Sequence, residues 1–239
     1  MDILTAYFID KKFEEYTKKE LMEILDTKII ITSEHIKAMK NNYKNIKYNY
    51  NIISLFETYG FIFTNDDYKQ ILNKNGLFIH DIPENKRTDE LYKIAVQQNG
   101  FALYYIPENM KTDEICGIAV NNYGYALVHV PHNKQTDVIL KIALMQTGYV
   151  LESIPEDRKT DEICKIAVKR TGCALQFVPE NKKTDKICMM AVQQTGYSLK
   201  YVPENKKTIE ICRIAIQENV SAIQFVPNTL KNIIHTMIK

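Results

Sequence analysis

Cysteine is the residue type whose spacing in this 239-residue chain first suggests chemistry. Thiolates at a regular spacing could bind zinc or form disulfides. Four of the five cysteines are separated by multiples of 24 residues: Cys116, Cys164, Cys188 and Cys212. Equivalent positions in stacked helices lie about 9 to 10 Å apart, whereas a disulfide needs α-carbons within about 7 Å and zinc holds sulfur at about 2.3 Å. We therefore expect free thiols in a hydrophobic core, with Cys173, which is off this register, packed as well.

Two histidines beside a proline are the other candidate ligands. His129 and His132 flank Pro131, and Asp137 follows shortly after. A metal site needs a further ligand at convincing spacing, and none is present in this stretch. Each glycine is single, so no phosphate-binding loop is expected, and the acids fall mostly at helix starts and turns. We predict no catalytic residues, no metal, no cofactor and no small-molecule substrate; the chain is not expected to be an enzyme.

A 24-residue unit repeated from residue 64 to residue 231 organises the chain. All seven prolines share one register: Pro83, Pro107, Pro131, Pro155, Pro179, Pro203 and Pro227. Six of the eight glycines share another: Gly76, Gly100, Gly124, Gly148, Gly172 and Gly196. A fixed period of this size is typical of a solenoid, in which each unit packs on its neighbours.

Each unit predicts two helices. A threonine opens the unit, usually followed by acids, which is the pattern of a helix N-cap. The first helix should run about eleven residues to the glycine, which we expect to end it in the left-handed conformation. A short second helix should stop before the proline, because the residue that precedes a proline avoids helix. An alanine in the first helix should lie where neighbouring helices approach closely: Ala95, Ala119, Ala143, Ala167, Ala191 and Ala215.

The predicted fold is all-α: an α-solenoid of tandem 24-residue helix-turn-helix repeats with a helical amino-terminal cap. Residues 64–231 form seven repeats, the first of them degenerate. Residues 1–63 form the cap, since Phe13, Tyr16 and Leu21 belong to an apolar stripe at helical spacing. Residues 232–239 form a carboxyl-terminal capping helix, with Asn232 as its N-cap.

The repeat resembles a known family. The residues that carry the resemblance are an Ala-Leu-x-x-Val-Pro-Glu run, then Asn-Lys-Lys-Thr, then Ile-Cys-x-x-Ala-Val, over residues 64–231. This pattern is similar to a tandem helical repeat of unknown function from giant viruses of amoebae and amoeba-associated bacteria. The resemblance implies an uncharacterised array, viral in origin, and supplies no catalytic residues.

Composition argues against several function classes. Lys and Arg number 31 against 29 Asp and Glu, so the net charge of +2 gives no electrostatic case for nucleic acid or an anionic membrane. No apolar run is long enough to span a membrane, and the first residues do not form a signal peptide. Unpaired cysteines favour a reducing compartment. We expect an intracellular, non-secreted protein of the cytoplasm, which is the host cytoplasm if the chain is viral.

Two surfaces are candidates for binding. The second helix carries a column of aromatic residues beside a row that varies between units, and we place a protein-partner site there: Tyr104, Tyr105, His129, Phe177, Lys200 and Tyr201. Side chains of these types often anchor interfaces. The first helix ends in amides: Gln97, Gln98, Asn121, Asn122, Gln193 and Gln194. The first hypothesis is a non-enzymatic scaffold that binds protein. The alternative is a binder of single-stranded RNA, read one base per unit.

Overall fold

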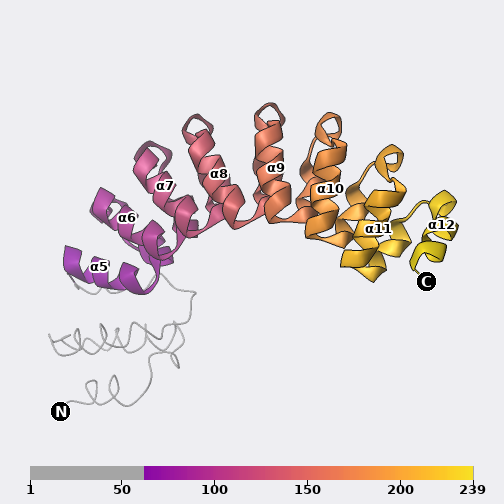
Figure 1. The fold of residues 1–239 in the computed structure, drawn as a ribbon. Helices are drawn as coiled ribbons and strands as arrows, with labels where there is room; N and C mark the ends of the chain where they lie inside the picture. Colours follow the sequence, from indigo (N-terminus) through magenta and orange to yellow (C-terminus); the bar gives the residue numbers. More distant parts are fainter. Residues whose placement is uncertain (1–61, 239) are drawn as a thin grey trace, which may run out of the picture. The chain divides into compact units, whose positions relative to one another are not determined.

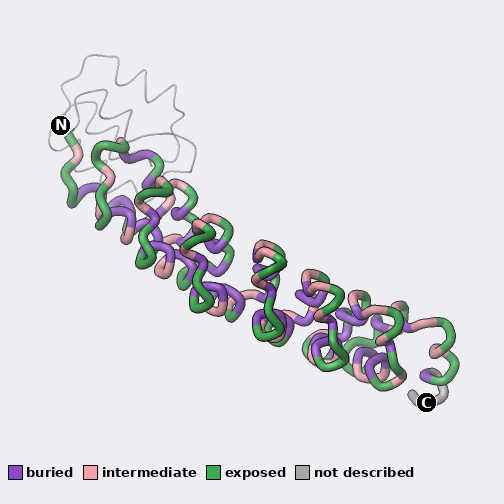
Figure 2. The backbone as a smooth tube through the Cα atoms, turned by 90° about the horizontal axis from the view of Figure 1, so that it is seen from above, coloured by how far each residue is buried: buried purple, intermediate pink, exposed green. Residues whose placement is uncertain are grey.

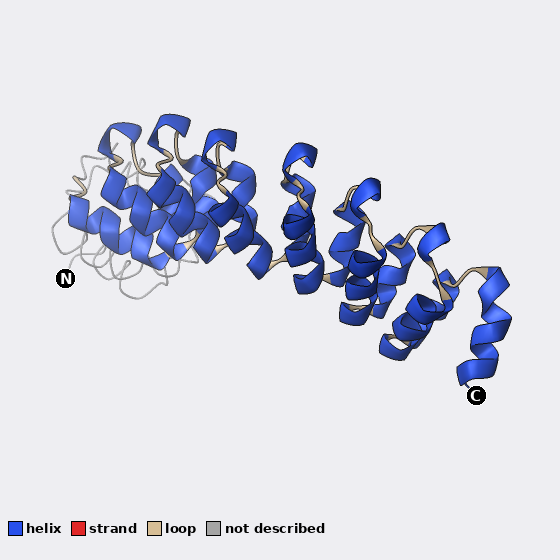
Figure 3. Ribbon diagram, turned by 45° about the horizontal axis from the view of Figure 1, so that its top comes forward, coloured by secondary structure: helices blue, strands red, loops and turns tan. Residues whose placement is uncertain are grey.

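The computed structural model describes residues 62–238, all of whose regular elements are helices (Figures 1 and 3). The chain divides into two compact units between Tyr105 and Ile106, and each is described by itself. The repeated helices confirm the predicted all-helical repeat array. The predicted amino-terminal cap lies outside the described residues, apart from residues 62 and 63.

Each of the first six repeats contains one α-helix and two 3-10 helices, and the seventh contains one α-helix and one 3-10 helix. The α-helices are α5 (Asn65–Lys74), α6 (Asp89–Gln98), α7 (Asp113–Asn122), α8 (Asp137–Gln146), α9 (Asp161–Arg170), α10 (Asp185–Gln194), α11 (Ile209–Glu218) and α12 (Asn228–Ile238). The longer 3-10 helices are η3 (Gly76–His80), η5 (Gly100–Tyr105), η7 (Gly124–His129), η9 (Gly148–Ser153), η11 (Gly172–Phe177), η13 (Gly196–Tyr201) and η15 (Val220–Phe225). The shorter ones follow each proline: η4 (Glu84–Lys86), η6 (Glu108–Met110), η8 (His132–Lys134), η10 (Glu156–Arg158), η12 (Glu180–Lys182) and η14 (Glu204–Lys206).

Threonine begins every repeat α-helix, as predicted. The Thr160 hydroxyl accepts a hydrogen bond from the Ile163 amide at 3.3 Å, and the equivalent bond is present in the other repeats. Thr64 adds a capping box, because Asp67 accepts from the Thr64 amide at 2.9 Å. These side chains satisfy amide groups that the first turn of a helix leaves without a backbone partner.

The glycine does not end the α-helix, so that prediction is wrong. Each α-helix ends two residues earlier, and the residue before the glycine is extended, with φ of −144° at Thr171. The glycine begins the following 3-10 helix, and none of Gly76, Gly124, Gly148, Gly172 and Gly196 has left-handed φ. In the last repeat the residue at the same place, Asn219, is also extended, with φ of −151°, and its side chain caps η15.

The glycine is required by packing against the next repeat. A β-carbon at Gly172 would lie 2.5 Å from the carbonyl oxygen of Ala191, and one at Gly196 would lie 2.1 Å from that of Ala215. These alanines are fully buried, which confirms that their register is a close contact between helices. The last repeat has no such successor, and its glycine position holds Val220, which is 74% exposed.

The predicted second helix has 3-10 geometry, and its period of about three residues per turn decides which side chains are buried. Ala174 and Leu175 on η11 and Val178 directly after it are buried, as predicted. Figure 2 shows buried residues recurring in each repeat along the chain. Full burial of one leucine contributes about 1.5 to 3 kcal/mol. The array is therefore held by an apolar layer between the α-helices and the 3-10 helices.

Many of the repeats contain a buried lysine that pairs with a glutamate. Lys111, Lys159, Lys183 and Lys207 precede the N-cap threonines, and each ammonium contacts a glutamate three residues earlier. Lys111 also donates to the carbonyl of His129 at 2.9 Å in the next repeat. Where the glutamate is replaced by His132, the lysine is replaced by Gln135. The two positions therefore change together within this chain.

The last helix begins earlier than predicted. It starts at Asn228, directly after Pro227, and not at residues 232–233. The Leu230 amide donates to the Pro227 carbonyl at 2.9 Å, so the turn that follows each proline here continues as an α-helix. Ile234 on α12 is buried.

Candidate partner-binding face

The six residues of the predicted site all lie on the longer 3-10 helices, but they belong to two units. Tyr104 and Tyr105 are on η5 in the first unit. The other four are on η7, η11 and η13 in the second unit: His129, Phe177, Lys200 and Tyr201. The two groups are therefore treated as separate surfaces.

Within a 3-10 helix, the residues one and four places after the glycine share a side because the period is three. We call them the exposed row. Its fourth-place members are all exposed: Tyr104, Val128, Glu152, Gln176, Lys200 and Gln224. Tyr104 is 59% exposed. These are the positions that vary between repeats, and each exposes its side chain to solvent.

The residues five places after the glycine form a half-buried row. Its aromatic members expose part of each ring: Tyr105, His129, Phe177, Tyr201 and Phe225. Burial, together with the nearby Lys111 charge, lowers the pKa of His129 and so favours the neutral imidazole. Lys200 lies over the Tyr201 ring, 5.6 Å from its centroid. This half-buried row presents apolar ring faces, and Lys200 of the exposed row adds a positive charge beside one of them.

Sequence reasoning missed the aromatic residues directly after the glycine. Four of them are exposed: Phe101, Tyr125, Tyr149 and Tyr197. Tyr149 contacts Phe177 edge-on at 6.5 Å between centroids, and Tyr197 contacts Phe225 at 4.9 Å. Each contact joins one repeat to the next across the two rows. The signal was present in the sequence as an aromatic residue after four of the six repeat glycines.

The first unit differs at one position of the half-buried row. Asp81 stands where all later repeats except the one with Ser153 carry rings, and it is buried. Burial raises the pKa of Asp81 to about 6, against the opposing charges of His80 and Arg87. The His80 ring contacts Asp81 at 3.0 Å and stacks on Tyr105 at 4.9 Å between centroids. The Tyr105 ring is thereby fixed from one side.

The predicted amide surface is partly structural. The side-chain oxygen of Gln194 accepts from the Gly172 amide at 2.6 Å, and that of Gln146 accepts from the Gly124 amide at 2.7 Å. The Thr171 hydroxyl likewise accepts from the Gly148 amide. These bonds join consecutive repeats through the amide of the repeat glycine. Gln194 is exposed but engaged, so one member of the proposed base-reading column has another role.

The column of four cysteines is buried, and all five thiols are free. Burial raises the pKa of Cys188 and of Cys212 to about 11 and that of Cys116 and Cys164 in the same direction. Cys173 departs from the prediction, because it is only half-buried. It follows Gly172 on the exposed row, where other repeats carry tyrosine.

The thiols should therefore react at two rates. With a chromogenic disulfide reagent at pH 8, we expect Cys173 to react first and the other four to stay protected until urea unfolds the chain. A pKa of about 11 leaves about one thiolate in a thousand at that pH. A Cys173→Ser variant serves as control and should lose the fast phase. Rapid native labelling of that variant would contradict a packed column.

Among residues 62–238, no group of three or more His, Cys, Asp and Glu side chains could hold a metal ion. His132 and Asp137 therefore gain no third ligand there. None of the described helices is long and apolar enough to cross a membrane.

The comparisons with known proteins address the repeats. The model of a family described as a domain of unknown function (DUF4116) matches residues 67–111, 88–134, 137–183 and 184–231. Each match spans nearly two 24-residue repeats, and together the matches cover more than half of the chain. No curated protein and no solved structure matches the chain.

Proposed function

The chain belongs to the DUF4116 family of helical repeats, and we propose that it is a non-enzymatic scaffold that binds a protein partner through the 3-10 helices of its repeats. The observation that carries the proposal is the exposed row of the second unit, flanked by partly exposed rings. Large aromatic side chains that are only half-buried lose little conformational entropy when a partner covers them.

Variation between repeats supports the same face. Core positions repeat because each meets the same neighbour, whereas the exposed row carries Val128, Glu152, Gln176 and Lys200 in consecutive repeats. These side chains differ in charge and size, and all are exposed. Such a series gives each repeat a different contact, as expected of a surface shaped to one extended partner.

A matched set of variants tests this proposal. Full-length protein, Tyr201→Ala and Gln193→Ala are each immobilised and exposed to host-cell lysate, and bound proteins are quantified by mass spectrometry. We expect one protein to be retained by the first and third samples and lost from Tyr201→Ala. With that protein purified, Tyr201→Ala and Tyr105→Ala should each weaken binding by more than about 1 kcal/mol, with melting temperatures unchanged.

Single-stranded RNA remains the second candidate, because all six predicted amides are exposed. The RNA hypothesis predicts a different binding result for these variants. RNA binding should weaken steeply with salt and be lost on changing Gln97 and Gln193 while surviving Tyr201→Ala. That outcome would replace the protein partner with RNA.

The setting of the function rests on the resemblance and on composition. We propose a viral source and a place in the host cytoplasm, because the repeat resembles arrays from giant viruses of amoebae, a resemblance that amoeba-associated bacteria share. Free cysteines in the core are consistent with a reducing compartment. Localisation of a tagged chain in infected cells tests both parts.

A further inference from the structure

An ion pair joins the α-helices of adjacent repeats at two steps, α5–α6 and α8–α9. It uses the fifth residue after the N-cap threonine in one repeat and the second residue after the threonine in the next. In the first unit, Lys69 pairs with Glu90 at 2.7 Å. In the second unit, Lys141 on α8 pairs with Glu162 on α9 at 2.8 Å. The same two positions therefore place an ammonium against a carboxylate in each unit.

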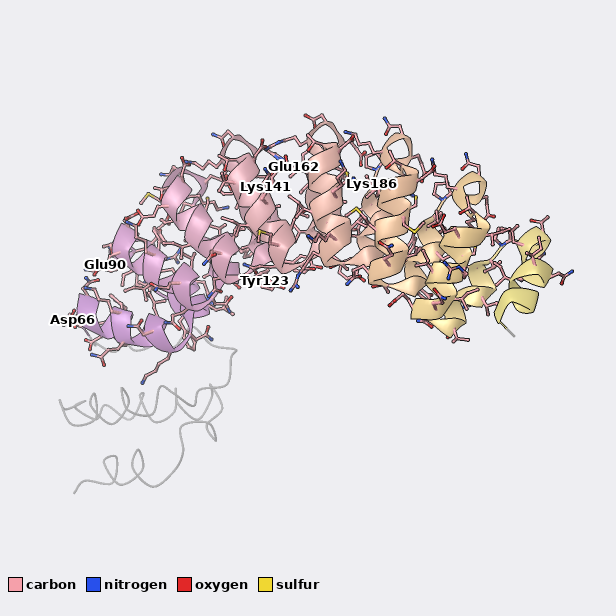
Figure 4. The ribbon with its side chains drawn as sticks, viewed as in Figure 1. Asp66, Glu90, Tyr123, Lys141, Glu162 and Lys186 are labelled. Carbon is pink, nitrogen blue, oxygen red and sulfur yellow. The ribbon has the colours of Figure 1, made fainter. Side chains whose placement is uncertain are left out.

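The step from α9 to α10 reverses one of these charges. Lys165 takes the place of Lys141, and Lys186 takes the place of Glu162. Figure 4 shows Lys141 and Glu162 side by side, with Lys186 toward the corresponding end of α10. Two ammonium groups thus occupy positions that hold an ion pair one repeat earlier. Like charges at such positions are unfavourable unless an anion lies between them.

The acids of this region already have other partners. Glu162 pairs with Lys141, Asp161 with Lys182 at 3.8 Å, and Asp185 with Lys206 at 2.7 Å. No salt bridge to Lys165 or Lys186 is present within the described part of the chain. Helix α9 also carries more basic residues than any other described helix of a repeat: Lys165, Lys169 and Arg170. The α9–α10 step is therefore a local excess of positive charge in a chain whose net charge is only +2.

We infer that this step is a second binding site, at which an acidic segment of a partner protein places a carboxylate between Lys165 and Lys186. The neighbouring step supplies the reason for a carboxylate, because Glu162 fills the same position next to Lys141. The site lies on the α-helices and not on the 3-10 helices, so it is independent of the proposed aromatic face. Charge complementarity of this kind chiefly sets the rate of encounter and the choice of partner.

Labelled peptides and two charge variants test the site. Binding of fluorescein-labelled hexaglutamate to the full-length chain is followed by fluorescence anisotropy at low salt. The variant Lys186→Glu restores the arrangement of the α8–α9 step. We expect it to weaken hexaglutamate binding at least about tenfold, because repulsion replaces attraction. We also expect its melting temperature to rise, since a new ion pair replaces two facing lysines.

Lys86→Glu is the matched control, because Lys86 is exposed and the substitution changes net charge equally. Its affinity for hexaglutamate should stay within about twofold of the original. Equal loss in both variants would overturn the site, since binding would then reflect net charge alone. An unchanged affinity in Lys186→Glu would also overturn it. Labelled hexauridine provides the phosphate arm, and tighter binding of hexauridine than of hexaglutamate would assign the lysines to nucleic acid.

Discussion

Replacing Gly196 by alanine should lower the free energy of unfolding by about 3 kcal/mol. The new β-carbon would lie 2.1 Å from the Ala215 carbonyl oxygen and 2.9 Å from the Asn219 amide nitrogen. The first atom belongs to the backbone of α11 and the second to the backbone of its C-cap residue, and backbone atoms cannot turn aside as a side chain would. Urea denaturation followed by circular dichroism measures the loss. A stability equal to that of the original chain would show that η13 and α11 do not approach so closely.

Gly117 provides the control within the same chain. It lies inside α7, and a β-carbon there would meet nothing within 4 Å. Alanine is a better helix former than glycine, so Gly117→Ala should stabilise the chain by about 0.5 to 1 kcal/mol. The same substitution should thus change the free energy of unfolding in opposite directions at Gly196 and Gly117, because only the repeat glycine contacts the next repeat.

Replacing Glu156 by alanine should cost about 2 kcal/mol, less than the 3 to 5 kcal/mol typical of a fully buried pair. The Lys159 side chain is 6% exposed and contacts Glu156 at 2.6 Å, whereas the Glu156 side chain is 70% exposed. Removing the carboxylate leaves a buried ammonium without its anion. Thermal and urea unfolding report the loss. Glu152→Ala, which removes an exposed acid nearby, should change stability by less than about 0.5 kcal/mol.

The third repeat indicates how the stability lost in Glu156→Ala can be regained. It carries His132 and Gln135 where most repeats carry glutamate and lysine, and the Gln135 amide donates to the Val130 carbonyl at 3.0 Å. The double variant Glu156→His with Lys159→Gln copies this arrangement and should regain most of the stability lost in Glu156→Ala. A double variant no more stable than Glu156→Ala would contradict the view that the two positions act as a pair.

Local chemistry made much of the fold predictable. Thr160 can cap its own helix, and Pro155 can stop the preceding segment, because each acts within a few residues. The period then transfers each assignment to every repeat. Buried positions such as Ala167 and Cys164 followed from the same logic, since a residue type that recurs at one register meets one neighbour. The fourth-place members of the exposed row were predictable for the opposite reason, because their residue types vary from repeat to repeat.

The sequence by itself determined the repeat, its helix starts and its core; the tertiary structure decided what depends on contact between repeats. The purpose of Gly196 could not be read locally, because the atom that excludes a β-carbon belongs to Ala215. Lysine is ordinarily a surface residue, and only the packed array shows Lys159 buried beside its glutamate. The positions of Lys165 and Lys186, 21 residues apart in sequence, correspond to those of Lys141 and Glu162, which form an ion pair only because consecutive α-helices pack on each other.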